Sequence, residues 1–205
     1  MIAKNAARGL ALSALLLAGP SFAFAQAHDM SSMPGMGGPK IVIAPGQGIA
    51  VADVEFMQGM IAHHAQAVWM SRLAYGRTDV NRQVLKLAKM IDQSQIPEIE
   101  IMQNWLRRYG QFVPDTSSWH HMQMAGMLSE EQATALNAAK GADFDRKFLE
   151  YMIQHHSGAI KMVADLLASP GAGQEVDISV FAPDVVTVQT AEIGLMLKLR
   201  KDELP

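Results

Sequence analysis

The chain has 205 residues, a formal net charge of −3 at pH 7 and no cysteine. A mildly acidic chain without basic runs lacks the electrostatic footprint of a nucleic-acid-binding protein. The absence of thiols excludes disulfides and thiolate metal sites. The 15 methionines are the compositional anomaly, and some of them should simply fill gaps in a core.

The N-terminus has the pattern of a secretory signal. Lys4 and Arg8 precede an apolar run, and small residues end at Ala25. We expect residues 1–25 to be a signal peptide, with cleavage after Ala25 or Ala27, and the mature protein to be periplasmic or secreted. The apolar run is too short for a convincing membrane span, and no later segment offers an uninterrupted apolar stretch of the necessary length.

Residues 26–49 should form a flexible arm, because they are rich in Gly, Pro and Met. Thioethers prefer soft cations, and a flexible arm can adapt to the low coordination number of Cu(I). The alternative is a spacer without metal chemistry. The candidate ligands of this arm are His28, Met30, Met33 and Met36.

The central feature of the sequence is a segment that occurs twice. Residues 53–70 contain the pattern D-x-x-F-M-x-x-M-I-x-H-H-x-x-A-x-x-M, and residues 145–162 repeat it with Leu149 in place of Met57. Apolar residues at steps of three and four predict a helix with one inward face in each copy. The first histidine of each doublet should lie on that face and the second at its edge. The candidate ligands are Met57, Met60, His63, His64, Met152, His155 and His156.

A second pattern, Q-x-x-E-I-x-x-M, begins at Gln95 and returns at Gln189. The two patterns recur at nearly the same offset, so the duplication covers a whole helical hairpin. We predict an all-α four-helix bundle domain in residues 50–205, because four such helices bury their apolar faces most simply in this way. Its parts are hairpin one at 50–110, a crossover at 111–141 and hairpin two at 142–203.

Two prolines should limit the second helix of each hairpin. Pro97 predicts a kink or a break near Ile96. Pro183 is expected in the first turn of the final helix, because proline is tolerated there.

The crossover contains a third group of imidazoles and thioethers, here on a loop. After it, Ser129 and Gln132 form a capping-box pattern that predicts a short helix to about Ala139. The candidate ligands of the loop are His120, His121, Met122, Met124 and Met127.

Inward histidines in a bundle first suggest a di-iron carboxylate centre, which needs Glu-x-x-His pairs. Here Met60 and Met152 occupy the position of that glutamate. A thioether favours Cu(I) or Ag(I) over iron and zinc. Met102 and Met196 are further candidate ligands, and the residues expected to orient imidazoles are Gln95, Glu98, Gln189 and Glu192.

The paired motifs, with the segment Gly126-Met127-Leu128-Ser129, resemble the exported domain-of-unknown-function 305 family, to which CopM-type copper proteins belong. The resemblance covers about residues 50–200. It implies a ferritin-like bundle, a periplasmic location, copper binding and copper tolerance. It assigns copper ligation to Met60, His63, His64, Met152, His155 and His156.

The sequence therefore predicts a periplasmic protein that sequesters or transfers Cu(I), without catalysis, with a copper exporter or chaperone as its natural partner. Alternatives are a bundle holding b-type haem between His and Met, a ferritin-like metal oxidase and an interaction module without metal. In a purely structural alternative the methionines are core packing, and His63 and His155 hydrogen-bond Gln95, Glu98, Gln189 or Glu192. The spacing is compatible with one site shared by both motif helices and with two separate sites.

Overall fold

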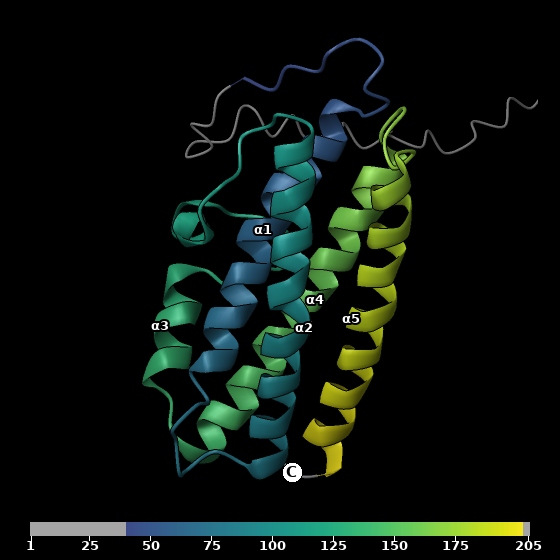
Figure 1. The fold of residues 1–205 in the computed structure, drawn as a ribbon. Coiled ribbons are helices and arrows are strands. Elements are labelled where there is room, and N and C mark those ends of the chain that lie inside the picture. Colours follow the sequence, from purple (N-terminus) through teal and green to yellow (C-terminus); the bar gives the residue numbers. More distant parts are fainter. Residues whose placement is uncertain (1–39, 203–205) are drawn as a thin grey trace, which may run out of the picture.

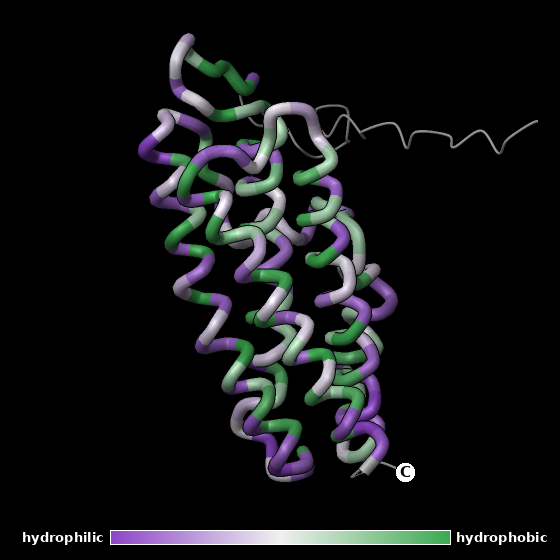
Figure 2. Tube along the Cα trace, turned by 90° about the vertical axis from the view of Figure 1, so that its right-hand side faces the viewer, coloured by the Kyte–Doolittle hydropathy of each residue, from purple (hydrophilic) through white to green (hydrophobic). Residues whose placement is uncertain are grey.

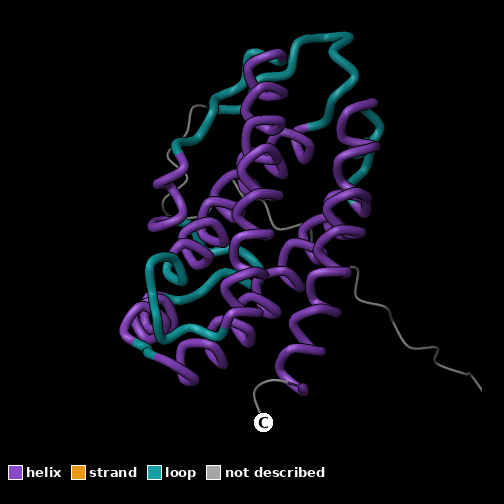
Figure 3. Tube along the Cα trace, turned by 60° about the horizontal axis from the view of Figure 1, so that its bottom comes forward, coloured by secondary structure: helices purple, strands orange, loops and turns teal. Residues whose placement is uncertain are grey.

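The computed structural model describes residues 40–202 (Figure 1). The predicted signal peptide and the arm residues His28, Met30, Met33 and Met36 lie outside this range. Within the described range there are helices and loops but no strand (Figure 3), which confirms the all-α prediction.

The long helices form two hairpins. α1 packs mainly against α2, α4 packs mainly against α5, and the hairpins meet along α1 and α4 (Figure 1). This pairing is that of a helical bundle. The elements are α1 (Val51–Arg72), α2 (Arg82–Arg108), η2 (Thr116–His121), α3 (Glu130–Ala138), α4 (Gly141–Ala168) and α5 (Val176–Asp202).

The core has two apolar clusters, with the histidine doublets between them along the bundle. Figure 2 shows hydrophobic and hydrophilic residues alternating along each helix. On α1 one cluster takes in Val54 to Ile61 and continues past the doublet to Ala65 and Val68, and the other begins at Ala67. On α4 the order is reversed, with Phe144 to Met152 in the second cluster and Ala159 to Leu166 in the first. The doublets therefore form a polar layer in the middle of the interior.

Each hairpin is fastened to the loop of the other by the first residue of the duplicated motif. The Asp53 carboxylate accepts the backbone N–H of Gly173, in the loop between α4 and α5, at 2.7 Å. The Asp145 carboxylate accepts the backbone N–H of Asn81, just before α2, at 3.1 and 3.2 Å. Both aspartates are buried. These reciprocal bonds make α1 and α4 antiparallel neighbours.

Residues 122–128 of the crossover, which we call the strap, lie across both motif helices. Gln66 of α1 accepts the Leu128 N–H at 2.8 Å, and Gln154 of α4 donates to the carbonyls of Gly126 and Met127 at 3.3 and 3.4 Å. After the strap, the predicted capping box opens α3: Gln132 N–H donates to Ser129 Oγ at 3.2 Å.

Pro97 does not break α2 and Pro183 does not lie in the first turn of α5, whereas a kink near Ile96 stays a prediction. α2 continues without a break through Pro97, and α5 starts at Val176, so that Pro183 lies inside the helix instead of in its first turn. A proline cannot donate to the carbonyl four residues earlier. Both prolines are on the solvent face, where water can hydrate the freed carbonyl, and packing of the inner face decides the helix limits.

α5 is the helix with the most apolar outer surface. By length and composition alone, Val176–Lys201 could cross a membrane. In the structure its inner face supplies Ile178, Phe181 and Val185 to the core, and Glu192 is also buried there. Val176, Val180, Leu195 and Leu197 of α5 are exposed, so the core takes up only part of the apolar surface of this helix.

Candidate metal centre

The second histidine of each doublet is held by the carboxylate of the Q-x-x-E-I-x-x-M pattern in its own hairpin. His64 donates through Nε2 to Glu98 at 2.6 Å, and His156 donates through Nε2 to Glu192 at 2.7 Å. Both imidazoles are fully buried. A carboxylate on one ring nitrogen fixes the ring orientation and directs the lone pair of the other nitrogen, Nδ1, into the interior.

This pairing corrects the sequence analysis at two points. The residues that meet Glu98 and Glu192 are His64 and His156, not His63 and His155. His64 is also completely buried instead of lying at the edge of the apolar face. The reason is that α2 packs against the side of α1 on which His64 lies, a placement that the spacing along α1 does not specify.

The first histidines of the two doublets meet each other across the hairpin interface. The ring centroids of His63 and His155 are 3.8 Å apart, with 40° between the ring planes. His63 also donates through Nε2 to the carbonyl of Ala125 in the strap at 3.0 Å. The two motif copies therefore come together at one place in the bundle.

The four buried histidines have more polar nitrogens than partners. Among the described residues, no hydrogen-bond partner exists for Nδ1 of His63, His64 and His156, or for either ring nitrogen of His155. The amide oxygens of Gln95 and Gln189 are also unpartnered, so neither amide oxygen accepts a bond from a histidine. Buried polar atoms without partners are costly. A ligand for them would remove that cost.

Burial also determines the protonation of His63 and His155. Desolvation, reinforced by the neighbouring His64, lowers the pKa of His63 to about 3. Desolvation and the proximity of His63 lower the pKa of His155 well below its ordinary value. Both rings are therefore neutral near pH 7. A neutral imidazole is the form that binds a metal ion.

The methionines predicted as ligands on the four long helices are core residues. Met60 and Met152 are fully buried one turn before the stacked histidines, and Met57, Met102 and Met196 are fully buried as well. Met57, Met60 and Met102 belong to one apolar cluster, and Met152 and Met196 to the other. Within residues 40–202 no three His, Asp or Glu side chains converge in a geometry suitable for an ion. Soft ligands would have to complete any site here.

The crossover candidates divide into buried and exposed residues. Met122 and Met127 are buried and Met124 is half-buried, whereas His120 and His121 are exposed. The ring of His120 stacks on Trp119 at 3.7 Å, and Trp119 packs against Trp69 of α1 at 5.1 Å. His120 and His121 thus lie on the surface, separate from the buried histidines.

Two contributors to the centre were not identified from sequence. The Ala125 carbonyl is a backbone group, so no side-chain pattern marks it. Gly158 leaves the strap room to approach α4, because a Cβ there would lie 1.9 Å from the Ala125 oxygen. A signal did exist: Gly158 stands where the first motif copy has Gln66.

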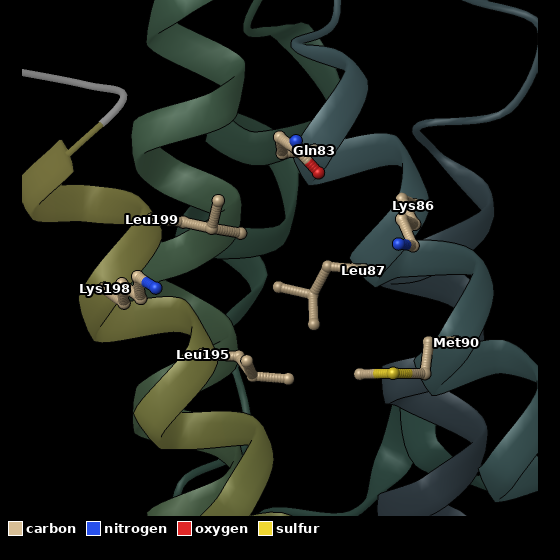
Figure 4. A pocket seen from close by; sticks show the side chains of 7 residues that line it. All are labelled: Gln83, Lys86, Leu87, Met90, Leu195, Lys198 and Leu199. Atoms are coloured by element: carbon tan, nitrogen blue, oxygen red, sulfur yellow. The ribbon is translucent and has the colours of Figure 1, made fainter.

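One groove in the described structure is separate from the histidines. It is an open groove of about 370 Å³ between the start of α2 and the end of α5. Figure 4 shows Leu87, Met90 and Leu195 facing it, with Lys86 and Lys198 at its sides. The groove offers a cation only one thioether, and its two ammonium groups would repel a cation. It is therefore not a candidate metal centre.

Solved structures show what this chain is similar to. A DUF305 fragment from Deinococcus radiodurans is 31% identical, with a TM-score of 0.65, over 74% of this chain and 96% of that chain. A DUF305 protein from Streptomyces coelicolor, named as secreted, is 29% identical, with a TM-score of 0.63, over 72% and 91%. CopM in its Cu(I)-bound form is 26% identical, with a TM-score of 0.58, over 73% and 96%.

CopM has also been solved in Cu(II)-bound, Ag-bound and apo forms. No curated protein matches the chain in sequence. The family model described as "Domain of unknown function (DUF305)" matches residues 53–200, which contain both hairpins. The chain belongs to the DUF305 family.

Proposed function

We propose that this protein binds Cu(I), and Ag(I) by the same chemistry, outside the cytoplasm, and either sequesters the ion or transfers it to a copper exporter or chaperone. The observation that carries the proposal is the set of unpartnered imidazole nitrogens on His63, His64, His155 and His156. Uptake and release of an ion convert no substrate into a product, so the proposed activity is binding and not catalysis.

The choice of ion follows from the donor set. Thioether and neutral imidazole are good ligands for Cu(I) and Ag(I), whereas ferric iron prefers oxygen and zinc has little use for thioether. Met60 and Met152 are fully buried one helical turn before His63 and His155. Similarity to CopM, which is known in copper-bound and silver-bound forms, supports the same choice.

The proposed location rests on two separate observations. The first 25 residues have the composition of a signal peptide. A relative that is 29% identical is named as a secreted protein. N-terminal sequencing of the exported protein checks the location, with a mature N-terminus at Gln26 or His28 expected.

The test of copper binding is competition with a Cu(I) chelator under reducing conditions. Met60→Leu removes a buried thioether with little change in volume, and we expect it to weaken Cu(I) binding about tenfold or more, by analogy with lost ligand support. Met90→Leu is the matched control, because Met90 lies in the groove between α2 and α5. Equal affinities of the two variants, or a preference for zinc, would contradict the proposal.

Elemental analysis distinguishes the copper bound by the arm from the copper bound by the bundle. A variant lacking residues 26–40 should bind less copper per chain, because it lacks His28, Met30, Met33 and Met36. It should keep the copper held by the bundle. Complete loss of copper in this variant would place all binding in the arm.

A further inference from the structure

The groove between α2 and α5 leaves apolar side chains in contact with water. α2 and α5 touch each other far less than the two helices within each hairpin do. Leu87, Met90, Leu195 and Leu199 line the groove, and Met90 and Leu195 are 38% and 46% exposed. Apolar surface in water is unfavourable, and a concave apolar surface with a few polar groups is typical of a ligand site. The groove is therefore a candidate ligand site.

Two lysines without acidic partners lie on opposite sides of this groove. Figure 4 shows Lys86 on α2 and Lys198 on α5, with Leu87 between them, and no acidic residue lines the groove. Lys147 and Lys161 pair with aspartates of their own helix. Within the described residues, the ammonium groups of Lys86 and Lys198 have no ion pair or hydrogen bond. The uncompensated positive charge of the groove suits an anionic ligand.

The groove is closed at one end and open at the other. The Ser94 hydroxyl of α2 donates to the Glu192 carboxylate of α5 at 3.5 Å, about one turn beyond Met90 and Leu195. The two lysines lie on the other side of Met90 and Leu195, towards the start of α2 and the end of α5. The apolar part of the groove is therefore next to its closed end, and the charged part is next to its open end.

The size of the groove favours a thin, flexible chain over a helix of another protein. Its volume of about 370 Å³ is at the lower end of the range for small-molecule sites. A helix is about 10–12 Å wide with its side chains, and one lying along the groove would have to pass over the contact between Ser94 and Glu192. An unbranched alkyl chain can end before that contact, with its polar head at the open end.

We propose that the groove binds a single-chain anionic amphiphile, with a fatty-acid carboxylate between Lys86 and Lys198 and the alkyl chain on Leu87, Met90 and Leu195. The two ammonium groups supply the charge complementarity, and covering the apolar floor supplies the hydrophobic contribution. None of the four buried histidines lines the groove, so this inference does not rest on the proposed copper binding.

Isothermal titration calorimetry with laurate, below its micellar concentration, tests the contacts of the carboxylate. The mature protein should bind laurate at a single site, and Lys86→Gln and Lys198→Gln should each weaken that binding about three- to fivefold. Lys89→Gln is the matched control, because Lys89 is exposed on α2 but does not line the groove. A parent protein that does not bind laurate, or equal weakening by Lys86→Gln and Lys89→Gln, would overturn the proposal.

A second pair of variants tests the contact with the alkyl chain. Leu195→Gln should weaken laurate binding about fivefold or more, because it places a polar amide against the chain. Leu197→Gln is the matched control and should bind laurate as the parent does, since Leu197 is 43% exposed on the same helix and does not line the groove. Equal affinities of these two variants would mean that the chain lies elsewhere, and the proposal would fail.

Two further measurements distinguish this ligand from other occupants. Dodecyltrimethylammonium has an alkyl chain of similar length and a cationic head, so an affinity equal to that for laurate would contradict the choice of an anion. Sedimentation with vesicles of phosphatidylglycerol and phosphatidylcholine tests a membrane surface. Binding to vesicles without binding of laurate would make this face a membrane contact and overturn the ligand site. Circular dichroism of each variant establishes that weaker binding is not a loss of fold.

Discussion

Asp53 and Gly173 are joined by a 2.7 Å hydrogen bond between a buried carboxylate and a backbone N–H 120 residues further along the chain. The same carboxylate also accepts the N–H of Ala50 at 2.8 Å, at the start of α1. One side chain therefore caps its own helix and fastens the loop of the opposite hairpin.

Asp53→Ala should lower the free energy of unfolding by about 1 to 3 kcal/mol, because it leaves buried N–H groups without an acceptor. Asp143→Ala is the control, since Asp143 is half-exposed and pairs with Lys147 on the surface of α4; its effect should stay within about 0.5 kcal/mol. Urea denaturation measures the free energy of unfolding of both variants. Similar midpoints for the two variants would show that the Asp53–Gly173 hydrogen bond is not important for stability.

Gly158→Ala should destabilise the protein by about 1 to 3 kcal/mol, because a side chain there displaces the strap. The added Cβ would lie 1.9 Å from the Ala125 oxygen. Gly194→Ala in α5 is the matched control, with no atom within 4 Å of its Cβ, and should stabilise by about 0.5 to 1 kcal/mol through helix propensity. Thermal unfolding compares the stabilities of the two variants. Equal stabilisation would mean that the strap can shift away from α4 at no cost in free energy.

Glu98→Ala should weaken Cu(I) binding by about 10- to 100-fold and lower stability, because it removes the carboxylate that orients His64. Glu98 accepts from His64 at 2.6 Å. Glu100→Ala, on the exposed side of the same helix, is the control and should change neither quantity appreciably. Chelator competition combined with urea denaturation separates a loss of copper affinity from a loss of fold.

The ion-free protein should lose stability as the pH falls from about 6.5 towards 3. Burial lowers the pKa of His63 to about 3 in the folded state, whereas an unfolded histidine titrates near 6.5. The unfolded chain therefore takes up the proton first, and the contribution of the neutral ring is complete above about pH 6.5 and decreases below it. At about pH 4.5 the loss from His63 is roughly 2 to 3 kcal/mol.

The check is the change in melting temperature between about pH 7.5 and 4.5 in the presence of a chelator. His63→Gln should show a smaller change than the parent, because glutamine does not titrate. Met90→Leu, in the groove between α2 and α5, removes no titratable group and should behave like the parent. A parent and a His63→Gln variant with the same pH dependence would contradict the burial of a neutral ring.

Much of the fold follows from the duplication in the sequence. The repeated doublets and the Q-x-x-E-I-x-x-M helices predicted two hairpins, and the structure pairs α1 with α2 and α4 with α5. The limits of α5 could not be predicted from Pro183, because the packing of its inner face outweighs one missing hydrogen bond on the solvent side. The ferritin-like label stays a prediction.

The site was predictable as a set of residues but not as a set of contacts. The doublets identified all four buried histidines, and Glu98 and Glu192 were expected to orient imidazoles. Which histidine meets which partner depends on the rotation of each helix about its axis, and a step of one residue changes that direction by about 100°. The bond from His63 to Ala125 depends on the path of the crossover, which no periodicity encodes.

The division of contacts between the hairpins bears on how such a chain arose. Each half keeps its own imidazole–carboxylate pair, His64 with Glu98 and His156 with Glu192. The aspartate fastenings and the stacked rings need both halves. A half-length chain with one copy of the motif could complete these contacts only by associating with an identical molecule.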